Sequence, residues 1–148
     1  MRFELKANYK LIALLDEGVY NGINYTKWSS LEGLQHISSF SNGVGPSMKQ
    51  LVKVDQQTKE LKPTQFYQNC KDLNLQIHVY TFRVDSLPKF ATNYRHLLKI
   101  FTEIVQVDGV FTDFPDLTIK FLNNSNRIAT ASLTTLLISF ILYVCIVE

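Results

Sequence analysis

The chain has 148 residues, of which 46% are hydrophobic and 19% are charged, and its formal net charge is +2. This balance is typical of a single globular domain and argues against a disordered, collagen-like or low-complexity chain. The basic residues are spread along the sequence, so nothing in it calls for a nucleic-acid partner. The two cysteines and three scattered histidines provide neither a disulfide framework nor the ligand spacing of a zinc enzyme.

The first part of the chain predicts a strand, a helix and a second, very short strand. The apolar run at residues 11–15 is typical of a buried parallel strand, and turn residues at 16–18 end it. Ser29 or Ser30 can cap the next helix, which ends near Phe40 and has an inward face of Leu31, Leu34 and Ile37. Residues 41–46 then form a turn, a very short strand and a second turn.

A helix and the clearest strand of the sequence follow. Pro63 and Thr64 begin the helix, because proline is favoured at a first helical position, and Asn74 ends it. Its predicted inward residues are Phe66, Tyr67, Cys70 and Leu73. The strand at 75–82 is rich in β-branched and aromatic residues, with an aliphatic face and a polar-aromatic face.

The last predicted elements are a helix, a short strand and a final helix. The helix at 93–105 is amphipathic, the strand is at 109–112, and the final helix opens at 113–116 and runs through Leu122. The expected inward face of the first of these helices is Tyr94, Leu97, Leu98, Phe101 and Ile104. Strands and helices thus alternate, which predicts parallel strands joined by right-handed crossovers. Without a glycine-rich phosphate loop, this order favours a (β/α) barrel over a nucleotide-binding sheet.

Four sequence motifs carry a family resemblance. QIHVYTFR at 76–83 is followed, after one helix, by VDGVFTDFPD at 107–116, and these resemble the last two strands of the glycerophosphodiester phosphodiesterase family. LLD at 14–16 and GVGPS at 43–47 resemble the two preceding strands, so the match runs from about residue 10 to residue 122. The resemblance implies an α/β fold: the C-terminal half, about strands 5–8, of a TIM (β/α)8 barrel. The expected organisation is a flank at 1–9, the partial barrel at 10–124 and a C-terminal apolar helix.

The resemblance also implies a reaction. In this family a divalent cation, calcium or magnesium, and two histidines cleave a glycerophosphodiester into an alcohol and glycerol 3-phosphate. The family's His-Arg pair and Glu-x-Asp ligands lie on earlier strands, and this sequence contains neither motif. We therefore expect no catalytic residue, no metal ligand and no cofactor in this chain, and no activity by the chain alone.

What these residues can contribute is a wall of the substrate cleft. Tyr80, Phe82 and Arg83 end one strand and Phe114 follows the next, at the mouth where barrel chemistry occurs. Arg83 can bind a phosphate through two oxygens or can be an exposed loop residue beside Asp85. Phe82 and Phe114 can instead pack at the barrel rim.

Several other polar residues have structural explanations. His78 lies mid-strand and is expected as a buried, hydrogen-bonded residue, whereas His36 and His96 are expected in solvent. Asp113 is expected to cap the final helix rather than to bind a metal. Gln106 stands where the family usually has a glycine, a left-handed position that costs a non-glycine residue about 1 kcal/mol.

The end of the sequence predicts membrane association. Residues 128–147 carry no charge, and a helix of about 20 residues spans roughly 30 Å, the thickness of a hydrocarbon core. Ten strongly apolar side chains in this segment favour insertion by about 3–6 kcal/mol. A buried last helix is the first alternative. A lipid-anchor signal, with small polar residues at 124–126, is the second. The apolar run near the N-terminus is too short for a secretory signal peptide.

Two functional hypotheses follow. In the first, the chain is part of a glycerophosphodiester phosphodiesterase that acts on a glycerophosphodiester only when the missing half is supplied. In the second, it is a non-catalytic, membrane-anchored half-barrel that binds a partner or self-associates, because half a barrel leaves exposed strand edges.

Overall fold

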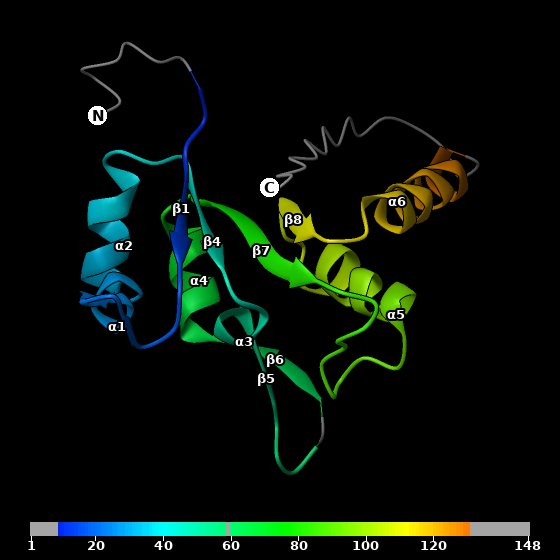
Figure 1. The fold of residues 1–148 in the computed structure, drawn as a ribbon, viewed down its shortest axis with the longest axis horizontal. Helices are drawn as coiled ribbons and strands as arrows, with labels where there is room; N and C mark the ends of the chain where they lie inside the picture. The colour runs from blue at the N-terminus through cyan, green and yellow to red at the C-terminus, as the bar shows by residue number, and fades with distance from the viewer. Residues whose placement is uncertain (1–8, 59, 131–148) are drawn as a thin grey trace. The chain divides into compact units, whose positions relative to one another are not determined.

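A computed structural model describes residues 9–58 and 60–130, with side chains through residue 124. The chain divides between Tyr80 and Thr81 into two compact units, here called the N-terminal unit and the C-terminal unit. Strand β7 (Gln76–Phe82) passes from the first unit into the second (Figure 1).

Three parallel strands form the sheet of the N-terminal unit. They lie in the order β1 (Ile12–Leu15), β4 (Gly43–Pro46) and β7, and each pairs with the next. Helix α2 (Leu31–Ser38) connects β1 to β4, helix α4 (Gln65–Asp72) lies between β4 and β7 in the chain, and the two helices contact each other (Figure 1). The predicted alternation of parallel strands and helices is confirmed here.

Close packing of the central strand depends on a glycine. All four residues of β4 are buried. A Cβ atom on Gly43 would lie 2.3 Å from the carbonyl oxygen of Gln76, closer than real Cβ atoms come to any backbone atom. Glycine at this position therefore allows β4 and β7 to pair at their first residues. The edge strand β1 is less covered than predicted, because Leu14 is 61% exposed.

The cap of helix α2 and most of its buried face agree with the prediction. The Ser30 hydroxyl accepts a hydrogen bond from the Gly33 N–H at 3.2 Å, so Ser30 is the cap residue. Leu34 and Ile37 are buried, but the prediction for Leu31 was wrong, because this side chain is 49% exposed. Leu31 is the first residue of the helix, one turn before Leu34, so it lies at the end of the buried stripe.

Two short hairpins and two short helices complete the N-terminal unit. Strands β2 (Val19–Tyr20) and β3 (Ile23–Asn24) form the first hairpin, and helix α1 (Tyr25–Trp28) follows it. Asn21 and Gly22 between the strands have φ of 48° and 76°, as tight hairpin turns require. Helix α3 (Met48–Leu51) leads into the second hairpin, β5 (Val52–Val54) and β6 (Leu61–Pro63).

The predicted start of helix α4 needs a small correction. Pro63 is the last residue of β6 and not the first of the helix, which begins at Gln65 with Thr64 as its cap. The Thr64 hydroxyl accepts a hydrogen bond from the Tyr67 N–H at 3.2 Å. Asn74 ends the helix region as predicted, with a left-handed φ of 53°. Cys70 is the predicted inward residue that is fully buried.

The C-terminal unit begins with the last two residues of β7. Strand β8 (Gly109–Thr112) follows, and the Asp113 N–H donates a hydrogen bond to the Phe82 carbonyl oxygen at 3.2 Å. Helix α5 (Tyr94–Lys99) continues into a π-helical turn, η1 (Ile100–Ile104), and α6 (Pro115–Thr130) is the last described helix. The core includes Phe82 and Phe101, whose rings meet edge to face with centroids 5.4 Å apart.

The π-helical turn corrects the predicted face of the helix at 93–105. The Val105 N–H donates to the Ile100 carbonyl oxygen at 2.8 Å, a bond that spans five residues. The wider turn rotates Ile104 outward, where it is 65% exposed, and brings Val105 inward, where it is 2% exposed. Gln106 then has the left-handed φ of 59° that its position predicted.

The architecture is mixed α/β with a parallel sheet, and the described strands do not close into a barrel. Their assignment to half of an eight-stranded barrel stays a prediction. Residues 131–147 of the predicted apolar segment lie outside the described residues, and its first three residues end α6. Among the helices that are described, none is both long and apolar enough to cross a membrane.

Candidate functional site

The carboxyl ends of the three parallel strands bring polar side chains together in the N-terminal unit. We call this set the carboxyl edge: Asp16 and Glu17 after β1, Ser47 after β4, Gln50 on α3, and Tyr80 on β7. Ser47 also forms a parallel bridge with Tyr80. Parallel strands align their carboxyl ends at one side of a sheet, which is where α/β proteins place their ligands.

Hydrogen bonds hold the carboxyl edge together. The Ser47 hydroxyl donates to a Glu17 carboxylate oxygen at 2.6 Å. The Gln50 side-chain oxygen accepts from the Ser47 N–H at 2.8 Å, and its amide nitrogen donates to the Asp16 carbonyl oxygen at 3.3 Å and to the Ser29 hydroxyl at 3.2 Å. The start of α3 is thereby tied to the end of β1.

Tyr80 is the predicted cleft residue at this edge. Its hydroxyl donates to the Leu15 carbonyl oxygen at 2.9 Å. Burial, together with the nearby negative charges of Asp16 and Glu17, raises the pKa of Tyr80 to about 12. The phenol therefore stays protonated at neutral pH and acts as a hydrogen-bond donor.

Arg83 lies between two carboxylates in the C-terminal unit. Its Nε and Nη2 donate to the two oxygens of Asp85 at 3.1 and 2.8 Å, and its Nη1 donates to Asp113. The Arg83 guanidinium lowers the pKa of Asp85, and Asp85 first and Asp113 second raise the pKa of Arg83. The alternative in which Arg83 pairs with Asp85 agrees with this geometry, and the guanidinium side chain remains 45% exposed.

Asp113 does not cap the final helix as predicted. Helix α6 begins at Pro115, so Asp113 precedes the cap position, and its carboxylate binds Arg83. The predicted acidic residue of the first helical turn is present as Asp116. The cap was predicted from local sequence, whereas the partner of Asp113 comes from a strand end 30 residues earlier.

A hydroxyl network joins α5, β8 and α6 in the C-terminal unit. The Tyr94 hydroxyl is hydrogen bonded to the hydroxyls of Thr112 at 2.6 Å and Thr118 at 2.7 Å. Thr112 also donates to the Phe82 carbonyl oxygen and accepts from the Phe114 N–H. This network fixes the end of β8, and Tyr94 and Thr118 were not among the predicted polar site residues. The helical spacing places Tyr94 on an apolar helix face and carries no signal for its hydroxyl partners.

The two predicted phenylalanines of the cleft wall are covered to different extents. Phe82 is fully buried against Phe101. Phe114 is half-buried, with its ring centroid 6.2 Å from that of Tyr94. Each ring therefore packs against another aromatic ring, and the assignment of the two residues to a cleft wall or to a barrel rim stays a prediction.

The three histidines occupy different surroundings. His78 is 5% exposed, as its mid-strand position predicted. His36 is exposed, with its ring 5.5 Å from that of Trp28. His96 is partly exposed, and its Nδ1 accepts a hydrogen bond from the Thr92 N–H at 3.2 Å.

The oxygen donors of the described residues decide whether a divalent cation fits. Calcium and magnesium need several oxygen ligands that converge on one point. In the described part of the chain, no group of three or more His, Cys, Asp or Glu side chains is placed to hold a metal ion. Asp113 and Asp85 are bound to Arg83, so the described residues do not fit the cation that the family resemblance implies.

Comparisons with known proteins identify similar sequences. No family model matches the chain. A glycerophosphodiester phosphodiesterase of Treponema pallidum is 29% identical over 111 residues, a match that covers 74% of this chain and 31% of the relative. One of Haemophilus influenzae is 29% identical over 107 residues, covering 72% of this chain and 29% of the relative. The chain resembles a region of these phosphodiesterases. It spans about a third of the length of the curated relatives, and the resemblance read from the strand motifs is confirmed.

Proposed function

We propose that this chain forms a wall of the substrate cleft of a glycerophosphodiester phosphodiesterase. The similarity to two phosphodiesterases over about three quarters of the chain is the observation that carries the proposal. The polar strand ends support it, each within its own unit: the Tyr80 hydroxyl, whose proton is donated to the Leu15 carbonyl, can accept a hydrogen bond through its oxygen, and Arg83 provides a half-exposed guanidinium. These groups suit the hydroxyl and phosphate groups of a glycerophosphodiester.

The wall does not by itself supply the chemistry of phosphodiester hydrolysis. That reaction needs positive charge on the non-bridging oxygens, a base for the nucleophile and an acid for the leaving oxygen. Arg83 can hold a phosphate only if it gives up one of its two carboxylate partners. We therefore propose that the cation and the proton-transferring residues come from another stretch of polypeptide, and that this chain alone is inactive.

Reconstitution tests the proposal. The purified chain is assayed with glycerophosphocholine and calcium or magnesium, alone and after co-expression with the part of the Haemophilus phosphodiesterase that it does not match. We expect release of glycerol 3-phosphate only from the co-expressed pair. Turnover by the chain alone at an enzymatic rate would overturn the inactivity, and an inactive but assembled pair would overturn the cleft assignment.

A matched pair of variants focuses this test on the cleft wall. Arg83→Gln removes the exposed guanidinium at the strand end and should lower the activity of the pair tenfold or more, since a charged hydrogen bond to phosphate contributes about 1.5–3 kcal/mol. Lys99→Gln removes an exposed charge of the same sign on α5 and should leave the activity unchanged.

Self-association is the second candidate function. Strand β1 lies at one end of the strand order, and Leu14 on it is 61% exposed. An edge strand with an exposed apolar residue favours pairing with another chain. Light scattering on the purified chain tests this proposal, and a monomer at high concentration would contradict it.

Membrane association through residues 128–147 remains a third proposal. Its support is the uncharged apolar sequence of that segment. Flotation of the full chain with lipid vesicles, compared with a chain that ends at residue 127, tests it. We expect only the full chain to float.

A further inference from the structure

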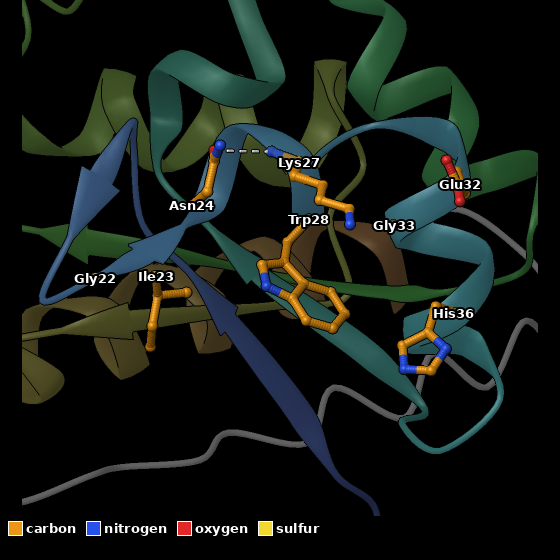
Figure 2. A pocket seen from close by; sticks show the side chains of 8 residues that line it. All are labelled: Gly22, Ile23, Asn24, Lys27, Trp28, Glu32, Gly33 and His36. Carbon is orange, nitrogen blue, oxygen red and sulfur yellow. Dashed lines mark hydrogen bonds between the residues drawn. The ribbon is translucent and has the colours of Figure 1, made fainter.

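A pocket in the N-terminal unit lies beside the β2–β3 hairpin and helices α1 and α2 (Figure 2). Its volume is about 590 Å³, and its wall includes Ile23, Lys27, Trp28, Glu32, Gly33 and His36. Pockets that take small molecules usually measure about 300–1,000 Å³. Neither the carboxyl-edge residues nor Phe82, Arg83 and Phe114 line it, so it is a separate site from the proposed cleft wall.

Local structure fixes the walls of this pocket. The Asn24 side chain caps α1 by accepting a hydrogen bond from the Lys27 N–H at 3.2 Å (Figure 2). A Cβ atom on Gly33 would lie 2.4 Å from the Lys27 carbonyl oxygen, so glycine there lets α2 approach the backbone of α1. The rings of Trp28 and His36 lie 5.5 Å apart across the two helices. The tryptophan ring is thereby held at the pocket wall.

The charges on the pocket wall have opposite signs. Lys27 and Glu32 are both exposed, and within the described residues neither forms an ion pair. A ligand that carries only negative charge is attracted by Lys27 and repelled by Glu32. A ligand that carries only positive charge is attracted by Glu32 and repelled by Lys27. A small ligand with both charges gains from both residues.

The half-buried Trp28 indicates which cation suits the pocket. Tryptophan is the best side chain for attracting a cation to a ring face, and a quaternary ammonium loses little hydration when it packs there. We propose that this pocket binds a small zwitterion, with a quaternary ammonium against Trp28 and Glu32 and an anionic group at Lys27. The anion can be a phosphate, as in phosphocholine, or a carboxylate, as in glycine betaine.

Trp28 also makes the pocket directly observable, because it is the single tryptophan of the chain. The full chain is titrated with phosphocholine, glycine betaine, choline or inorganic phosphate at constant ionic strength while tryptophan fluorescence is recorded. We expect saturable changes with one or both zwitterions, at a Kd on the order of 1 mM, and at least threefold weaker binding of the singly charged probes. The comparison of phosphocholine with glycine betaine shows whether the pocket prefers a phosphate or a carboxylate as the anionic group. Equal responses to all four probes, or no saturable response, would overturn the proposal.

Variants then locate the binding. Lys27→Gln and Glu32→Gln change exposed side chains and should each raise the Kd about threefold or more. Lys53→Gln, an exposed lysine on β5, is the matched control and should leave the Kd unchanged. Saturation-transfer nuclear magnetic resonance, which detects magnetisation passed from the protein to the ligand's N-methyl protons, gives a second measurement. This signal should persist in Trp28→Phe and weaken in Trp28→Ala. Unchanged binding in Lys27→Gln and Glu32→Gln would overturn the assignment to this pocket, whatever becomes of the phosphodiesterase proposal.

Discussion

Tyr80 shows how a strand-end residue acquires its properties from its neighbours. The sequence places it on a polar-aromatic face, but the Leu15 carbonyl that accepts its hydrogen bond belongs to a residue 65 positions earlier. Burial is the larger cause of its raised pKa, and the carboxylates of Asp16 and Glu17 add to it. A group of this kind positions a ligand or a strand rather than transferring protons at neutral pH.

The raised pKa of Tyr80 predicts its titration. The folded state keeps the phenol proton more tightly than the unfolded chain, whose tyrosines ionise near 10, so Tyr80 should titrate near 12. Its contribution to stability is present below pH 10 and is lost as the pH rises toward 12. Nuclear magnetic resonance of labelled tyrosine, assigned with Tyr80→Phe, measures the pKa. In Glu17→Gln the pKa should fall but stay above 10, because burial remains, and titration of the wild-type residue at 10 would contradict the structure.

Arg83 and Gln106 differ in how well the sequence predicts their properties. The left-handed φ of Gln106 agrees with what the family resemblance implied, because the family usually has a glycine at this helix end. The pairing of Arg83 with Asp113 depends on two strand ends 30 residues apart, and the sequence left the partner open. Residue conformation was thus easier to predict than residue partners.

At the scale of elements, the contact between α1 and α2 depends on one position. Gly33 lies in the first turn of α2, where a Cβ atom would meet the carbonyl oxygens of Lys27 at 2.4 Å and Trp28 at 2.5 Å. Backbone atoms cannot rotate away as the end of a side chain can. The two helices must therefore separate if this residue gains a side chain.

We expect Gly33→Ala to lower the free energy of unfolding by about 1–3 kcal/mol, the usual cost of an overpacked position. Urea unfolding measures the change. Glu32→Ala, at the exposed position beside it, should change stability by no more than about 0.5 kcal/mol and serves as the control. Equal effects of the two substitutions would show that the helices are not in close contact.

The π-helical turn at Ile100–Ile104 provides a second matched pair. Val105 is 2% exposed and Ile104 is 65% exposed, the reverse of what a regular amphipathic helix predicts for Ile104. Val105→Ala should cost about 1.5 kcal/mol, since two buried methyl groups are lost. Ile104→Ala should cost less than about 0.5 kcal/mol. Thermal unfolding of the two variants compares them, and a larger loss for Ile104→Ala would mean that the helix is regular.

At the scale of the whole molecule, the open sheet leaves β1 at one end. Leu14→Lys places a charge on this strand, as natural edge strands often do to avoid pairing. If the chain self-associates through β1, the variant should shift light scattering toward the monomer, whereas Lys10→Gln, an exposed change just before the strand, should not. Association that survives Leu14→Lys would exclude this edge as the interface.

Sequence alone determined the order of β1, β4, β7 and β8 with the main helices between them, limited the cap of α2 to Ser29 or Ser30, and carried the family resemblance. These features depend on periodicity, turn chemistry and motifs that lie close together in the chain. Sequence alone did not determine the π-helical turn that buries Val105, the hydrogen bond between Ser47 and Glu17, or the pocket at Trp28. Only the tertiary structure decided these features, because each depends on how separate elements pack. Packing brings together side chains that lie far apart along the chain. The sequence near each of them does not indicate which distant partner it contacts, so the packed structure decides the partner.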